Sequence, residues 1–65
     1  MNSYLYAELL SIMRELDSII FELESISAGI RNDFTGIGNE QCAAAIDRIL
    51  SYYYEYRRQL SNIDT

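Results

Sequence analysis

Apolar residues recur along almost the whole chain at alternating steps of four and three, and this spacing restricts the fold more than any other feature. In the first half the row consists of Leu5, Leu9, Ile12, Leu16, Ile19, Leu23, Ile26 and Ile30. In the second half it consists of Cys42, Ile46, Ile49, Tyr53, Tyr56, Leu60 and Ile63. A mean step of about 3.5 residues keeps side chains on one stripe of an α-helix. The sequence therefore predicts two amphipathic helices, over about residues 4–32 and 39–63.

The segment between the two rows is predicted to be a turn over about residues 33–38. It contains Phe34, Gly36 and Gly38, and the two glycines can adopt the positive φ angles that reverse a chain. Asn39 is a suitable N-cap for the second helix. A connection this short makes the helices antiparallel neighbours. The predicted fold is all-α, a single domain formed by a two-helix hairpin with coiled-coil-like packing.

The residues of the two rows are assigned to the seam between the helices. This predicted core seam comprises Leu9, Ile12, Leu16, Ile19, Leu23, Ile26, Ile46, Ile49, Tyr53, Tyr56 and Leu60. Other apolar residues lie outside the rows and are predicted to form an outward partner interface, namely Leu10, Met13, Ile20, Phe21, Leu50, Tyr52 and Tyr54. Contiguous exposed apolar surface usually marks a protein interface. The hairpin is therefore expected to form a four-helix bundle by homo- or heterodimerisation.

The length of the chain also indicates a need for a partner. At 65 residues a lone core rarely buries enough apolar surface, and disulfides, metals or oligomerisation usually compensate. The chain has one cysteine, Cys42, and no histidine, so no disulfide framework, metal site or cofactor is expected. Cys42 lies on the predicted seam beside three alanines, where we expect a buried, inert thiol.

Charge and residue types exclude several functions. The net charge of −5 disfavours nucleic acid as a ligand. The carboxylate pairs Glu15/Asp17 and Glu22/Glu24 are two residues apart, face different sides of a helix, and are expected to be solvated. Without a histidine or a nucleophile–base pattern, the sequence predicts a protein that is not an enzyme.

The N-terminus lacks the basic segment of a secretory signal, and no apolar run is long enough to cross a bilayer. The expectation is synthesis in the cytosol without membrane insertion.

Phe34-Thr35-Gly36 at the predicted turn resembles the Trp-x-Gly motif of the WXG superfamily, with Phe34 in the Trp position. These are small helical hairpins associated with bacterial type VII secretion systems. The segment from Asn32 to Ala45 resembles members encoded beside toxins that carry an LXG domain. The resemblance implies a partner protein that binds the N-terminal helical domain of such a toxin, or a second small helical protein, and supports export without a cleaved signal peptide.

Two alternatives remain open. Ala45-Ile46-Asp47-Arg48-Ile49 resembles the Leu-Asp-Lys segment of helical-hairpin phosphatases that act on phospho-aspartate response regulators, which implies a catalytic role for Asp47. The Ser-Gln-Glu that precedes this segment in those phosphatases is absent. The other alternative is a plain structural bundle formed by two copies of the chain.

Overall fold

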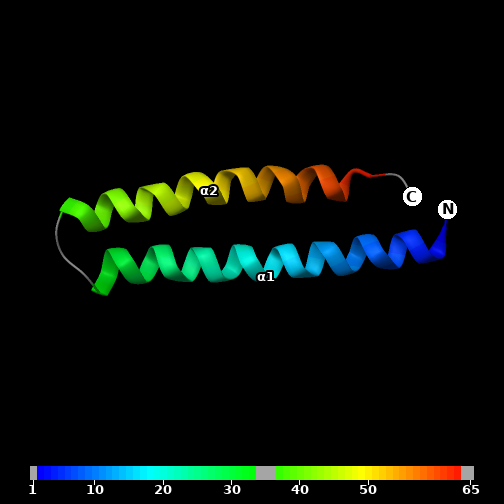
Figure 1. Ribbon diagram of the computed structural model, residues 1–65, viewed down its shortest axis with the longest axis horizontal. Coiled ribbons are helices and arrows are strands. Elements are labelled where there is room, and N and C mark those ends of the chain that lie inside the picture. The colour runs from blue at the N-terminus through cyan, green and yellow to red at the C-terminus, as the bar shows by residue number, and fades with distance from the viewer. Residues whose placement is uncertain (1, 34–36, 64–65) are drawn as a thin grey trace.

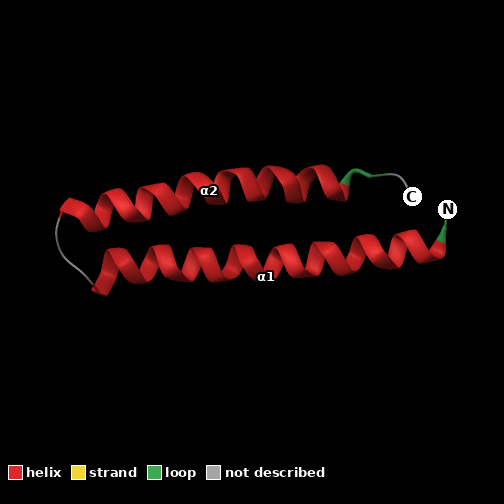
Figure 2. Ribbon diagram, viewed as in Figure 1, coloured by secondary structure: helices red, strands yellow, loops and turns green. Residues whose placement is uncertain are grey.

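A computed structural model of the protein describes residues 2–33 and 37–63. The described chain forms two α-helices, α1 (Ser3–Asp33) and α2 (Ile37–Ser61), and contains no strand. The helices lie side by side and antiparallel, with the first residues of α1 and the last residues of α2 at the same end of the molecule (Figure 1; Figure 2). The hairpin extends over 51 × 15 × 10 Å. The predicted all-helical hairpin is confirmed.

The start of α1 is fixed by a residue that sequence analysis did not single out. The Oδ1 atom of Asn2 accepts hydrogen bonds from the backbone N–H groups of Tyr4 at 2.9 Å and Leu5 at 3.2 Å. The backbone oxygen of Asn2 accepts a further bond from the N–H of Tyr6. Asn2 is therefore the N-cap of α1, and an Asn directly before an uninterrupted helical stretch was the signal that could have identified it.

The second helix begins earlier than predicted. Because α2 starts at Ile37, Gly38 and Asn39 lie inside its first turn, and the predictions of Gly38 as a turn residue and Asn39 as an N-cap are wrong. A Cβ atom at Gly38 would meet nothing within 4 Å, so the surroundings do not require glycine there. The predicted turn residues Phe34 and Gly36 lie outside the described residues.

The seam observed between the helices shares six positions with the predicted seam. At the other five predicted positions, the residue that lies in the seam is the next one along the chain. The half-buried or buried residues of the seam are Leu9, Met13, Leu16, Ile20, Leu23, Ser27 and Ile30 on α1 and Asn39, Ala43, Ile46, Leu50, Tyr53, Arg57 and Leu60 on α2. The predicted positions Leu9, Leu16, Leu23, Ile46, Tyr53 and Leu60 are half-buried in the hairpin. The predicted positions Ile12, Ile19, Ile26, Ile49 and Tyr56 are wrong, because all five side chains are exposed.

The predicted and observed seams can differ because the sequence offers apolar residues at both of the places that could lie between the shared positions. On α1, Leu9, Leu16 and Leu23 are seven residues apart, and the seam position between them can lie three residues on, at Ile12 and Ile19, or four residues on, at Met13 and Ile20. Both choices alternate steps of three and four, so periodicity permits two seams. The hairpin uses the seam that contains the small residues Ser27 and Ala43, which are 3% and 0% exposed. Small side chains there let the helices approach closely near the turn, and polar side chains beside this seam pair across the helices.

Candidate functional site

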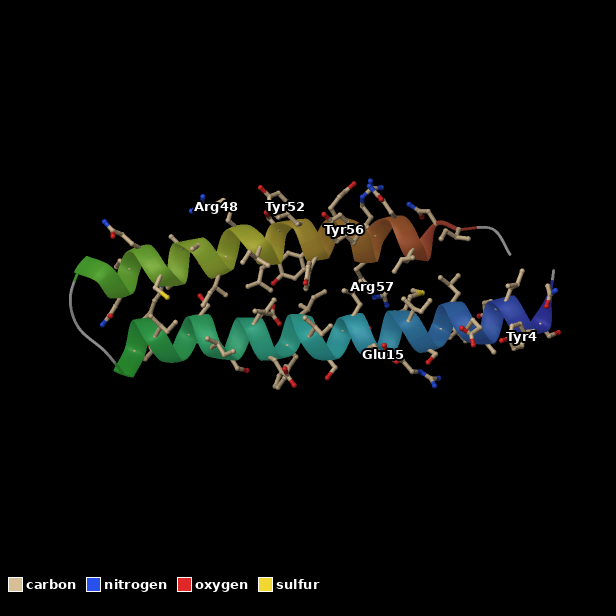
Figure 3. The ribbon with its side chains drawn as sticks, in the orientation of Figure 1. Tyr4, Glu15, Arg48, Tyr52, Tyr56 and Arg57 are labelled. Atoms are coloured by element: carbon tan, nitrogen blue, oxygen red, sulfur yellow. The ribbon has the colours of Figure 1, made fainter. Side chains whose placement is uncertain are left out.

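One flank of the hairpin is polar and carries the contacts that join the helices electrostatically. Asp17 accepts hydrogen bonds from the Nε and Nη2 atoms of Arg57 at 2.7 and 3.3 Å. The Tyr54 hydroxyl donates to the Oε2 atom of Glu24 at 2.6 Å, which raises the pKa of the Tyr54 phenol. The side chain of Arg57 extends from α2 toward α1 (Figure 3). Asp17 and Glu24, which we expected to be solvated, therefore take part in contacts between the helices.

Nearer the turn, the same flank holds a network of three polar residues. The buried Ser27 hydroxyl donates to Oδ1 of Asp47 at 2.7 Å, and Arg31 approaches Oδ2 of Asp47 at 2.7 Å and Oγ of Ser27 at 3.0 Å. The hydrogen bond from Ser27, together with the Arg31 guanidinium, lowers the pKa of the Asp47 carboxyl. Both oxygens of Asp47 are thus occupied by groups of the chain itself. We call this set of residues, Asp17, Glu24, Ser27, Arg31, Asp47, Tyr54 and Arg57, the polar flank.

The lowered pKa of Asp47 predicts a dependence of stability on acid. Because the carboxyl titrates at lower pH in the folded chain than in the unfolded chain, its contribution is present above about pH 4 and is lost as the pH falls through the folded pKa. The thermal midpoint of Asp47→Asn, measured by circular dichroism, is expected to lie below that of the parent at about pH 6, and the two midpoints are expected to converge as the pH falls through the folded pKa of Asp47.

Arg31→Gln provides the matched control, because it removes the other partner of the same pair. The double variant is expected to resemble either single one, as residues of one network do not act additively. If the difference between the thermal midpoints of Asp47→Asn and the parent stayed constant down to low pH, the network of Ser27, Arg31 and Asp47 would not be the cause of the acid dependence.

The opposite flank of the hairpin is apolar. On α1 the contacts of the polar flank come from Asp17, Glu24 and Arg31, each directly after a seam position, and on α2 Asp47 and Tyr54 do the same. The residues three after Leu9, Leu16 and Leu23 on α1, and three after Asn39, Ile46, Tyr53 and Leu60 on α2, project to the other flank, because three residues turn a helix by about 300°, which is 60° back from the seam position. Leu5 continues the α1 row at the same seven-residue repeat. In an antiparallel pair this places them on one common side. They are Leu5, Ile12, Ile19 and Ile26 on α1 and Cys42, Ile49, Tyr56 and Ile63 on α2, and we call them the apolar flank.

The side chains of the apolar flank remain open to solvent. Its aliphatic and tyrosine residues are between 42% and 52% exposed. Near the open end of the hairpin, a hollow of about 420 Å³ is lined by Tyr56, Gln59, Leu60 and Ile63, so two residues of the flank also form its wall. The Cα atoms give this face a length of 51 Å and a width of 15 Å.

The predicted partner interface is divided by the structure. Ile20 and Leu50 are only 8% and 5% exposed and Met13 is half-buried, so the prediction that these three residues face outward is wrong. They lie in the seam because the seam contains the residue directly after each of Ile12, Ile19 and Ile49. Leu10 is half-buried beside the polar flank.

The remaining predicted interface residues, Phe21, Tyr52 and Tyr54, are exposed, and a role for them in binding stays a prediction. Tyr52 projects from the side of α2 that faces away from α1 (Figure 3).

Across residues 2–33 and 37–63, no group of three or more His, Cys, Asp or Glu residues is placed to hold a metal ion. Cys42 is exposed and not buried as expected, because it lies on the apolar flank and not in the seam. Each oxygen of Asp47 accepts one contact from the chain itself, Oδ1 from Ser27 and Oδ2 from Arg31, and the side chain is 44% exposed.

Comparisons with known proteins add no identity. No protein-family model, curated protein or solved structure matches the chain. Neither α1 nor α2, over the residues described, contains a stretch sufficiently long and apolar to cross a membrane.

Proposed function

We propose that the protein is a binding module whose apolar flank packs against a helical partner and completes a four-helix bundle. The observation that carries the proposal is the difference between the two flanks. One flank joins the helices by ion pairs and hydrogen bonds, whereas the other leaves a straight row of aliphatic and aromatic side chains exposed along both helices. In a monomer this row stays exposed and contributes no stabilisation by burial. A partner that covers it removes apolar surface from water, which stabilises the complex by roughly 25 cal/mol per Å².

The class of partner comes from the resemblance of Phe34-Thr35-Gly36 to the WXG motif. By this resemblance the partner is the N-terminal helical domain of an LXG toxin or a second small helical protein, and the complex supports export by a type VII secretion system. Covering the apolar surface of the toxin domain would keep that domain from aggregating before export. The two-helix hairpin layout of the chain is the feature of the structure that supports this proposal.

The test is co-expression with the products of the adjacent genes, followed by affinity purification and measurement of the complex by light scattering. The parent chain is expected to co-purify with a helical partner in a defined ratio. The double variant Ile12→Asp/Ile19→Asp is expected to lose the complex, because two carboxylates would lie unpaired in the covered flank. Its circular dichroism spectrum should stay helical, since both positions are exposed in the hairpin.

Ser11→Asp/Ser18→Asp is the matched control. It adds the same two charges one residue earlier on α1, where the side chains point away from the apolar flank. The control is expected to bind as the parent does. Loss of binding in both double variants, or failure of every adjacent helical protein to bind the parent, would remove the proposal.

A further inference from the structure

The two edges of the apolar flank differ in charge. Glu8, Glu15 and Glu22 each lie four residues before an Ile of the flank, so each stands beside it on the preceding helical turn. All three are exposed, and none takes part in an ion pair within the described part of the chain. The corresponding edge of α2 is formed by Ala45, Tyr52 and Gln59, which carry no charge. One edge is therefore acidic and the other neutral.

The spacing of the three carboxylates suits recognition by another helix. Residues seven apart on a helix are separated by about 10.5 Å along its axis, at 1.5 Å per residue. This separation is close to the Debye length of about 8 Å at physiological salt, so each carboxylate interacts mainly with the charge directly opposite. A partner helix packed on the flank would present its own residues to this edge at the same seven-residue repeat.

Building on the proposed function, we infer that the apolar flank selects a partner helix with a basic edge. That helix carries Lys or Arg every seven residues beside its own apolar stripe, and these cations pair with Glu8, Glu15 and Glu22. The selectivity comes from the edge, whereas burial of the apolar flank supplies most of the affinity. The neutral edge of α2 makes the recognition one-sided, so it also fixes which helix of a partner lies beside α1.

A second copy of this chain fits the flank less well. If two copies met with their turns at opposite ends, α1 would lie on α1 and the two acidic edges would face each other. If the turns lay at the same end, each acidic edge would face the neutral edge of α2, and the carboxylates would have no cation opposite. Either dimer also brings together two chains that each carry a net charge of −5. A basic edge on the partner removes both problems.

The experiment uses the full chain and two synthetic amphipathic helical peptides of equal length. The peptides share one Ile/Leu stripe and differ only at the neighbouring heptad position, which is Lys in one and Glu in the other. Binding is measured by fluorescence anisotropy at low and high salt. The Lys peptide is expected to bind about tenfold tighter at low salt, as three exposed pairs would give, and the preference should shrink as salt rises.

Two triple variants separate the edge from net charge. Glu8→Gln/Glu15→Gln/Glu22→Gln and Ala28→Lys/Ala44→Lys/Ser51→Lys both change the net charge by +3, from −5 to −2. Only the first alters the edge, because Ala28, Ala44 and Ser51 are exposed and none of them lies three or four residues from an edge glutamate. The Gln variant is expected to lose the preference for the Lys peptide, and the Lys variant is expected to keep most of it.

The outcomes distinguish this inference from the proposed function. Equal binding of both peptides that is lost in Ile19→Asp overturns the charge selection and leaves the apolar flank as the binding surface. A preference that survives in the Gln variant, or a homodimer that excludes both peptides, also overturns it. If neither peptide binds while a helical partner still co-purifies, the inference fails and the proposed function stands. If co-purification fails as well, both are wrong.

Discussion

Replacing Ile20 with Asp is expected to unfold the hairpin, whereas the same replacement at the adjacent Ile19 is expected to leave it folded. Ile20 is 8% exposed in the seam between α1 and α2, and Ile19 is 42% exposed on the apolar flank. Asp at the buried site loses the packing of the Ile side chain and places a carboxylate in the apolar seam. The cost is about 3 kcal/mol or more, and a domain of this size has a stability of only about 3–5 kcal/mol.

The measurement is helical content and thermal unfolding by circular dichroism at concentrations where light scattering gives the monomer mass. Ile20→Asp should show little helix and no cooperative transition, whereas Ile19→Asp should keep both. Leu50→Asp and Ile49→Asp repeat the comparison on α2, where Leu50 is buried and Ile49 is exposed. If Ile19→Asp unfolded the chain and Ile20→Asp did not, the seam would lie where sequence periodicity placed it, and the apolar flank would not exist.

Replacing Ala43 with Leu is expected to destabilise the hairpin, although a leucine at a seam position strengthens the apolar pattern. Ala43 is 0% exposed, and Ser27 on the opposite helix is also buried. A larger side chain would force the helices apart near the turn and disturb the contacts of Ser27 with Asp47. Overpacking of this kind costs about 1–3 kcal/mol, which corresponds to a fall in the thermal midpoint of about 4–8 °C for each kcal/mol.

Ala44→Leu is the matched control, because Ala44 is exposed and Leu has nearly the same helix propensity as Ala. Its thermal midpoint should differ little from that of the parent. A midpoint for Ala43→Leu equal to or above the parent value would show that the space between the helices at this level is larger than the structure indicates.

The candidate binding surface could be predicted only in part. Sequence analysis expected apolar surface in excess of what two helices cover, and the hairpin does leave such a surface. It assigned Ile12, Ile19 and Ile49 to the core and Ile20 and Leu50 to the interface, which is the reverse of their places in the structure. Runs of adjacent apolar residues such as Ile19-Ile20-Phe21 supply a hydrophobic side chain to either choice of seam. Hydropathy therefore could not separate the core from the outward face.

The sequence by itself determined that this chain is helical, that it reverses once, and that its apolar rows repeat every seven residues. Local propensity and the absence of proline favour the helices, and the break between the two apolar rows marks the reversal, because these signals act within a few residues. Only the tertiary structure decided which apolar row is covered. That choice depends on contacts between residues far apart in the chain, namely the pairs Asp17–Arg57, Arg31–Asp47 and Ser27–Asp47, and no periodicity within one helix contains them.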